Sequence, residues 1–128
     1  MPDSSKLQVL VVDDDPSTQR LFTVVLQSQS CEIAGLADNG ADAVALFKES
    51  SPGLVLLDVD MPEMNGIDAL KEILSVDSAA SVVMLTTEKS QSVAGDCILA
   101  GAKDYIQKDL GLEGIHVRLS EVLAEINA

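Results

Sequence analysis

Short apolar runs alternate with longer amphipathic segments along this chain, and this alternation limits its fold more than any other feature. Gly, Pro, Asn or Asp marks each change between the two kinds of segment. The apolar runs are mostly continuous, as in strands that are buried on both faces. We therefore predict an α/β fold with one doubly wound parallel sheet of five strands, accompanied by five helices. The predicted strands are Gln8–Val12, Glu32–Ala37, Leu54–Leu57, Ser81–Leu85 and Asp104–Gln107.

The amphipathic segments carry helix signals. Asp15 can cap the free N–H groups of the first helix, and Pro16 fits its first turn, where the missing N–H costs nothing. This helix should extend to about Gln29, and the second should follow Asn39 and end before Pro52. Helical spacing groups Ala41, Val44 and Ala45 in the second helix, Ile67, Leu70 and Leu74 in the third, and Ile115, Leu119, Val122 and Ile126 in the last.

The fourth helix, roughly Gln91–Ala100, has Gly95 and Asp96 in its middle. Gly inside a helix costs on the order of 1 kcal/mol relative to Ala. We hypothesise that this helix opens more easily than the other four.

The length and composition suit one domain. A chain of 128 residues, 47% of them apolar, can bury one core, and we predict that residues 1–128 form it with residues 1–6 as a short tail. The sequence shows neither an apolar run of the roughly 18 residues that a membrane span needs nor a signal peptide, so we predict a cytoplasmic protein. Cys31 and Cys97 fit no metal-binding spacing and should be buried, reduced thiols.

The charge balance argues against two classes of partner. The formal net charge is −13 and the pI is about 4.1, so the surface should repel nucleic-acid phosphates and anionic lipid headgroups. We therefore predict neither direct nucleic-acid binding nor membrane binding.

Polar side chains stand where the predicted strands end. In an open parallel sheet the ligand site lies beyond the carboxyl ends of the strands, where the direction of winding reverses. The residues at those ends are Asp13 and Asp14 after the first strand, Asp58 and Asp60 after the third, Thr86 after the fourth and Lys108 after the fifth.

This set of side chains predicts a metal and phosphoryl site. Crowded carboxylates repel one another unless a cation neutralises them, and Mg²⁺ or Mn²⁺ is the natural partner for so small a group of oxygen ligands. The Thr86 hydroxyl and the Lys108 ammonium suit a transferred phosphoryl group. Asp58 is the most informative position, because an apolar strand leads straight into its charge.

Four segments together form a specific pattern: Val9–Pro16, Leu56–Gly66, Met84–Thr87 and Ala100–Lys108. In these segments the sequence resembles the receiver domains of response regulators, the phosphorelay family of two-component signalling. The resemblance implies a flavodoxin-like fold with strand order 2-1-3-4-5. It also implies that Asp58 is the phosphoacceptor, that Asp14 binds the metal directly, that Asp13 often acts through water, and that Asp60 contributes its backbone carbonyl.

The resemblance further implies a signalling role. The phosphoryl donor would be a histidine kinase or a phosphotransfer protein, and the domain would catalyse only its own phosphorylation and dephosphorylation. Thr86 and Tyr105 would act as switch residues that reshape the face made by the fourth helix, the fifth strand and the fifth helix. That face would contact a downstream protein or effector domain, and in many family members it also forms phosphorylation-dependent homodimers.

One departure from the family pattern follows the site lysine. The family usually has Pro there, often after a cis bond, whereas this chain has Asp109. A cis bond without Pro costs about 2.5–4 kcal/mol, so we predict a trans Lys108–Asp109 peptide and a shifted loop. Asp109 could also compete for Lys108. His116, the lone histidine, does not match a phosphodonor site and should lie on the surface.

Two other interpretations remain open at this point. A pseudo-receiver would keep the fold but bind partners without phosphorylation, and Asp109 leaves room for it. A haloacid-dehalogenase-type phosphatase also places a nucleophile and an acid as in Asp58-Val59-Asp60, although the upstream acidic pair and the short chain count against it. A flavodoxin-like cofactor binder is less favoured, because no phosphate-binding loop rich in Ser, Thr and Gly follows the first strand.

Overall fold

The computed structural model describes residues 6–61, 65–87 and 91–126, and five strands alternate with five helices through them. This is the order that the hydrophobic pattern predicts. The elements are β1 (Gln8–Val12), α1 (Pro16–Ser28), β2 (Glu32–Ala37), α2 (Gly40–Ser50), β3 (Leu54–Asp58), α3 (Gly66–Val76), β4 (Val82–Thr86), α4 (Gln91–Leu99), β5 (Asp104–Gln107) and α5 (Gly111–Ile126).

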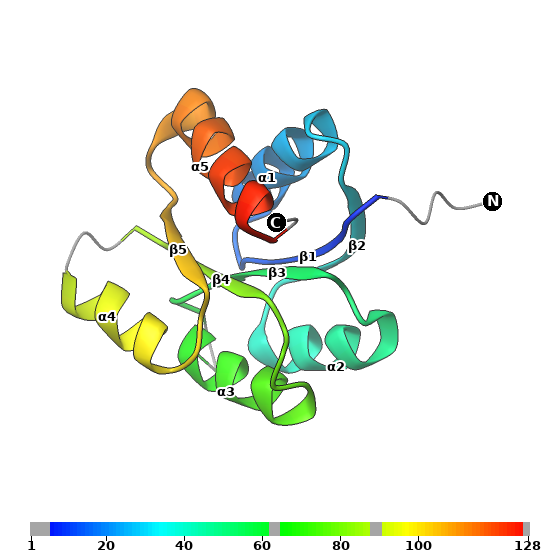
Figure 1. The fold of residues 1–128 in the computed structure, drawn as a ribbon, viewed down its shortest axis with the longest axis vertical. Helices are drawn as coiled ribbons and strands as arrows, with labels where there is room; N and C mark the ends of the chain where they lie inside the picture. The colour runs from blue at the N-terminus through cyan, green and yellow to red at the C-terminus, as the bar shows by residue number, and fades with distance from the viewer. Residues whose placement is uncertain (1–5, 62–64, 88–90, 127–128) are drawn as a thin grey trace.

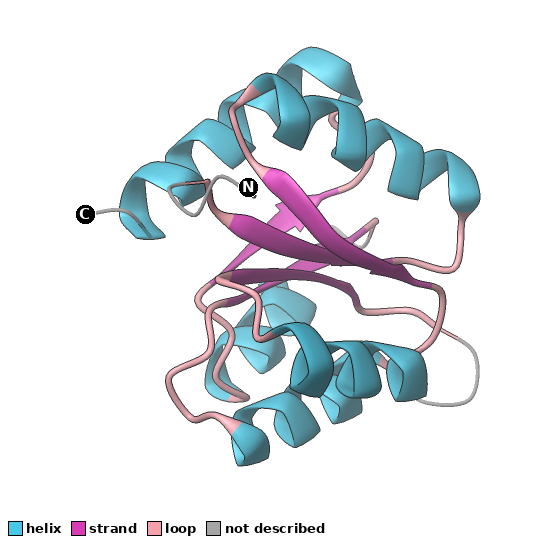
Figure 2. Ribbon diagram, turned by 90° about the vertical axis from the view of Figure 1, so that its right-hand side faces the viewer, coloured by secondary structure: helices cyan, strands magenta, loops and turns pink. Residues whose placement is uncertain are grey.

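The strands form one parallel sheet with the order β2-β1-β3-β4-β5, as the family resemblance implies. Helices α1 and α5 cover one face of the sheet, and α2, α3 and α4 cover the other (Figure 1). The result is a three-layer structure with the sheet in the middle (Figure 2). The chain changes from one face to the other between β1 and β3, so the carboxyl ends of these two strands mark the topological switch point.

Alternating side chains of the central strands build two separate cores. Leu10 and Val12 of β1 point into the core under α2, α3 and α4, where Ile73 is fully buried. Val9 and Val11 point into the core under α1 and α5 with Phe22. Because successive side chains of a strand face opposite sides, a strand buried on both faces must be apolar throughout. This explains the continuous apolar runs.

Two strands differ by one residue from the prediction. β3 extends to Asp58, which pairs with Leu85, and β4 is displaced to Val82–Thr86, with Thr86 paired to Gln107. The ladder therefore continues past the last apolar residue of each strand. A polar residue can end a ladder because pairing is a property of the backbone. As a consequence, the backbones of Asp58 and Thr86 are fixed by the sheet.

The predicted apolar face of α2 is partly wrong. Val44 is buried, but Ala41 and Ala45 are exposed, and the face that packs on the sheet is completed by Ala43 and Phe47. Phe47 offers far more apolar area than an alanine, and it sets the rotation of the helix. The predicted stripes of α3 and α5 do face the core.

Several local predictions agree with the structure. The Asp15 carboxylate caps α1 by accepting a hydrogen bond from the Ser17 amide at 3.0 Å. His116 is exposed, and both cysteines are buried free thiols. In the described part of the chain every peptide bond is trans, and this includes the bond between Lys108 and Asp109. Within the same residues, no helix has both the length and the apolar character to cross a bilayer.

Candidate functional site at the carboxyl edge of the sheet

Backbone hydrogen bonds fix the residues at the ends of the strands. The Asp13 amide donates to the Ala37 carbonyl at 3.0 Å, and the Lys108 amide donates to the Thr86 carbonyl at 2.8 Å. Asp58 lies within β3 itself. The ladder of the sheet and the hydrogen bonds that continue it therefore hold Asp13, Asp58, Thr86 and Lys108 at one edge of the sheet.

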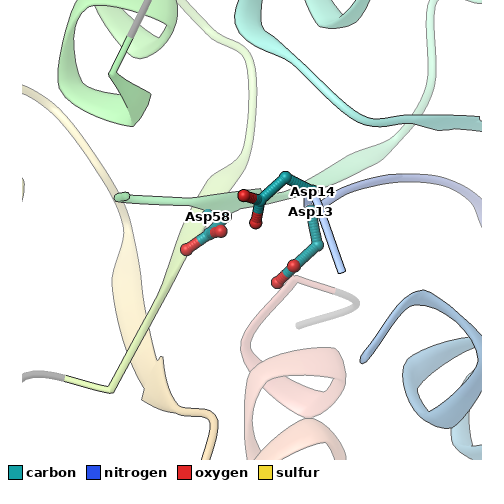
Figure 3. Close-up of side chains that lie close together, drawn as sticks. All are labelled: Asp13, Asp14 and Asp58. Atoms are coloured by element: carbon teal, nitrogen blue, oxygen red, sulfur yellow. The ribbon is translucent and has the colours of Figure 1, made fainter. Parts of the chain in front are cut away.

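Asp13, Asp14 and Asp58 form an acidic cluster. Each offers one carboxylate oxygen, and the three oxygens lie within 4.8 Å of one another. Figure 3 shows the three side chains together at the ends of neighbouring strands. Asp13 and Asp58 are 0% and 1% exposed, whereas Asp14 is exposed, so the cluster is open to solvent on one side only. Oxygen ligands in this arrangement suit a hard divalent cation that retains some of its water.

Lys108 bridges the two buried members of the cluster. Its ammonium Nζ donates to Asp13 Oδ2 and to Asp58 Oδ1, both at 3.0 Å. The acidic cluster has three carboxylates, and among the described residues Lys108 is the only lysine that forms an ion pair with it. The cluster therefore keeps a net negative charge. This excess charge would attract a cation.

The two oxygens of Asp58 have different surroundings. Oδ1 accepts from Lys108 and, at 3.2 Å, from the Asp60 amide. Oδ2 is buried without a hydrogen-bond partner. A buried carboxylate oxygen without a partner is costly, and such an atom in a native site calls for an explanation. A cation or a reacting group at Oδ2 supplies one, so the residues present fit a bound metal.

The pKa values of the cluster reflect burial. Burial raises the pKa of Asp58 to about 6, opposed by the hydrogen bond from Lys108 and reinforced by the charge of Asp13. Burial also raises the pKa of Asp13, against hydrogen bonds from the Asp15 amide and from Lys108. For Lys108, burial favours the neutral form, but the hydrogen bonds to both carboxylates outweigh it and its pKa is raised. At neutral pH the lysine is therefore charged, and Asp58 is mostly ionised.

The other predicted residues lie around this cluster. Thr86 is 1% exposed at the end of β4, the strand next to Asp58. Tyr105 in β5 is half-buried and packs against the core under α3 and α4, and its carbonyl accepts a hydrogen bond from Arg118 at 2.8 Å. Asp60 is exposed, and its described contact with the cluster is made by its amide.

Two residues with structural roles at the site were not predicted. The Gln19 amide of α1 donates to the carbonyls of Asp13 and Ala37 at 2.6 and 3.1 Å. Gly66, the first residue of α3, approaches the Asp58 backbone so closely that a Cβ atom would overlap the Asp58 carbonyl oxygen. For Gly66, the sequence offered one indication of a structural role, its position just after the capping Asn65. For Gln19 the sequence offered no such indication, because polar residues are common in the first turns of helices.

The comparisons with known proteins agree with this geometry. The family model described as response regulator receiver domain matches residues 9–120. The chemotaxis protein CheY of Bacillus subtilis is 42% identical over 117 residues, which cover 88% of this chain and 98% of the relative. The CheY of Thermotoga maritima is 41% identical over 101 residues, or 79% of this chain and 84% of that protein.

A solved structure is also similar. The crystal structure of the CheX–CheY–BeF3–Mg²⁺ complex from Borrelia burgdorferi contains a chain that matches with a TM-score of 0.85 and 32% identity. The match covers 91% of this chain and 89% of that one.

Proposed function

This chain belongs to the response regulator receiver domain family, and on that premise we propose that Asp58 accepts a phosphoryl group while a divalent cation is held beside it. The observation that carries the proposal is the buried Oδ2 atom of Asp58, which has no hydrogen-bond partner. Lys108 holds the other oxygen of the same carboxylate, which leaves Oδ2 as the oxygen without a hydrogen bond.

The acidic cluster would hold the cation. We propose that Asp13, Asp14 and Asp58 supply carboxylate oxygens to Mg²⁺ or Mn²⁺ and that Asp60 adds its backbone carbonyl. The bound ion would neutralise the carboxylates and draw charge from the phosphoryl oxygens. The solved relative from Borrelia burgdorferi, crystallised with BeF3 and Mg²⁺, supports this reading.

The chemistry would be an in-line phosphoryl transfer. Oδ2 of Asp58 forms a bond to phosphorus as the bond from phosphorus to the donor nitrogen breaks, and that nitrogen takes up a proton. The Lys108 ammonium and the Thr86 hydroxyl, at the ends of the two strands next along the sheet, would meet the negative charge of the phosphoryl oxygens. Water later breaks the acyl phosphate, which releases inorganic phosphate and restores Asp58. The domain is thus a signalling module and acts only on itself.

The signal would leave through the face of α4, β5 and α5. We propose that phosphorylation draws Thr86 inward and lets Tyr105 turn toward the core, which shifts a population of states that already exist. The donor would be a cytoplasmic histidine kinase or phosphotransfer protein. A downstream protein or effector domain would bind the switched face, and the similar CheX–CheY complex supports a protein partner. A phosphorylation-dependent homodimer through the same face belongs to this proposal.

Intact-mass analysis after incubation with phosphoramidate and Mg²⁺ tests the proposal. The native chain and Asp60→Asn should each gain one phosphoryl group, because Asp60 is proposed to act through its backbone alone. Asp58→Asn should gain none. Addition of EDTA should abolish the gain. A folded native chain that takes up no phosphoryl group would favour the phosphorylation-independent pseudo-receiver instead. The phosphatase interpretation is not favoured by the family match.

A further inference from the structure

The side chain of Gln19 joins the ends of β1 and β2. Its Nε2 atom lies 2.6 Å from the Asp13 carbonyl oxygen and 3.1 Å from the Ala37 carbonyl oxygen. Carbonyl oxygens can only accept, so the amide nitrogen of Gln19, not its oxygen, must face them. The two hydrogens of the NH₂ group match the two acceptors. This fixes the orientation of the amide without any assumption about hydrogen positions.

These bonds restrain the peptide unit that links Asp13 to Asp14. Gln19 holds its carbonyl oxygen, and the Asp13 amide one peptide earlier donates to Ala37. On the other side, the Asp15 amide donates to Asp13 Oδ1 at 2.8 Å. Asp14 lies between these restraints, outside both β1 and α1. Its exposed side chain is not placed by burial, so the backbone must direct it.

We propose that Gln19 is a positioning residue for Asp14 and thereby sets the affinity of the acidic cluster for a divalent cation. The inference rests on the metal site of the proposed function, but not on phosphoryl transfer to Asp58. Gln19 contacts neither the cation nor the phosphoryl group in this scheme. It acts through the Asp13 carbonyl, as outer hydrogen bonds commonly orient the ligands of a metal.

Gln19→Met is the informative variant. Met has nearly the length of Gln and keeps its apolar contacts, but it removes both donors. Gln19 is half-buried and lines an open hollow of about 520 Å³ together with Asp38 and Asp42. Ala37 also lines this hollow, so water that enters it can replace a donor lost from Gln19, and the variant should still fold. Gln27→Met is the matched control, since Gln27 is an exposed residue of the same helix.

The first measurement is a Mg²⁺ titration followed by the backbone amide resonances, without any phosphoryl donor. We expect the Kd of Gln19→Met for Mg²⁺ to rise roughly tenfold, as for other outer-shell substitutions, and that of Gln27→Met to stay as in the native chain. In the metal-free proteins, the Asp14 amide resonance should move only in Gln19→Met.

The second measurement separates positioning from general damage. The phosphorylation rate of Gln19→Met with phosphoramidate should fall at low Mg²⁺ and recover toward the native rate at saturating Mg²⁺. An unchanged Kd together with a lower unfolding temperature would show that Gln19 only braces the fold, and would overturn the inference. A native chain that binds Mg²⁺ but takes up no phosphoryl group would refute the proposed function, while the comparison of Kd values would still decide the role of Gln19.

Discussion

Asp58 carries a charge that the fold compensates only in part. Its pKa is raised from 3.8 to about 6, mainly by burial, so between these values the folded protein holds more protons than the unfolded chain. The contribution of this group to stability is greatest below pH 4, where the carboxyl is neutral in both states. It declines as the pH rises and is lost above about pH 6. The site therefore destabilises the metal-free protein at neutral pH.

Asp58→Asn should stabilise the metal-free protein. At pH 7.5 in EDTA we expect the free energy of unfolding to rise by on the order of 2 kcal/mol, because the change removes a buried charge of the acidic cluster. Near pH 4 the gain should nearly vanish. Urea denaturation at both pH values measures the effect, with the exposed Asp60→Asn as the control. An equal gain in the free energy of unfolding at pH 7.5 and near pH 4 would mean that removal of the Asp58 charge is not the cause of the gain.

Lys108→Met should have the opposite effect. Without its ammonium the two buried carboxylates of Asp13 and Asp58 lose their shared cation. We expect the metal-free protein at pH 7.5 to lose roughly 3 kcal/mol, a typical cost of removing one partner from a buried ion pair. The loss should be smaller at pH 5, where Asp58 is largely protonated. A double-mutant cycle of Lys108→Met and Asp58→Asn measures the coupling free energy between the two side chains. If the effects of the two substitutions on stability simply add, the two side chains are not coupled and the prediction is wrong.

The sequence could predict the residues of the acidic cluster but not their restraints. Asp13, Asp14 and Asp58 follow from one rule, that the ends of parallel strands meet at one edge of the sheet. The free Oδ2 atom of Asp58 depends on side-chain packing, which no motif records. The role of Gln19 depends on two backbone carbonyls from different strands, and only their spatial positions reveal it.

At the scale of secondary structure, the first residue of α3, Gly66, packs directly on the backbone at the end of β3. The Gly66 amide donates to the Val59 carbonyl at 2.8 Å, and a Cβ atom at this position would overlap the Asp58 carbonyl and lie 2.8 Å from the Val59 Cα. Gly66→Ala should therefore shift the backbone of Asp58 and Val59. We expect a loss of about 1–3 kcal/mol in stability, as for other overpacked sites, and a slower phosphoryl uptake. If the variant keeps the stability and the phosphoryl uptake of the native chain, the backbone around Gly66 can adjust to a Cβ atom without cost, and the prediction is wrong.

Helix α4 should open more easily than the other helices. Of its described side chains, Val93 to Leu99, only Cys97 is buried. Amide hydrogen exchange should therefore be faster in α4 than in α1, α2, α3 and α5. Equal protection in all five would contradict this.

Gly95→Ala tests the cause of that opening. A Cβ atom at Gly95 would have no neighbour within 4 Å, so the substitution changes helix propensity without changing packing. It should stabilise α4 by about 1 kcal/mol and slow exchange there by roughly fivefold. The other helices should keep their native exchange rates. Unchanged exchange in α4 would exclude the glycine as the cause.

The order of the elements was predictable, but the rotation of one helix was not. Short continuous runs indicated strands, and capping residues such as Asp15 indicated where helices begin. The face of α2 was assigned from its alanines, whereas Phe47 determines which side is buried. The last paired residues of β3 and β4 were missed because ladder pairing does not require apolar side chains. Hydrophobicity thus locates elements better than it orients or ends them.

At the scale of the whole molecule, the topology concentrates charge at one place. The winding reverses between β1 and β3, and the acidic cluster lies at the carboxyl ends of those strands. The chain as a whole carries a formal charge of −13. Any salt should therefore stabilise the protein to some degree by screening repulsion between like charges. Specific binding of a cation must be separated from this general effect.

The unfolding temperature in MgCl2 and in NaCl at equal ionic strength separates specific cation binding from general screening. A ligand that binds only the folded state at ten times its Kd adds about 1.4 kcal/mol to stability, so Mg²⁺ should raise the unfolding temperature of the native chain more than Na⁺ does. In Asp14→Asn the excess should disappear, because the exposed ligand of the acidic cluster is lost. Asp38→Asn removes the same charge from an exposed position outside the acidic cluster and should keep the excess. If the two salts act alike on the native chain, its response to Mg²⁺ is screening alone and the acidic cluster is not a metal site. If the excess disappears in both variants, net charge rather than ligand geometry governs the response.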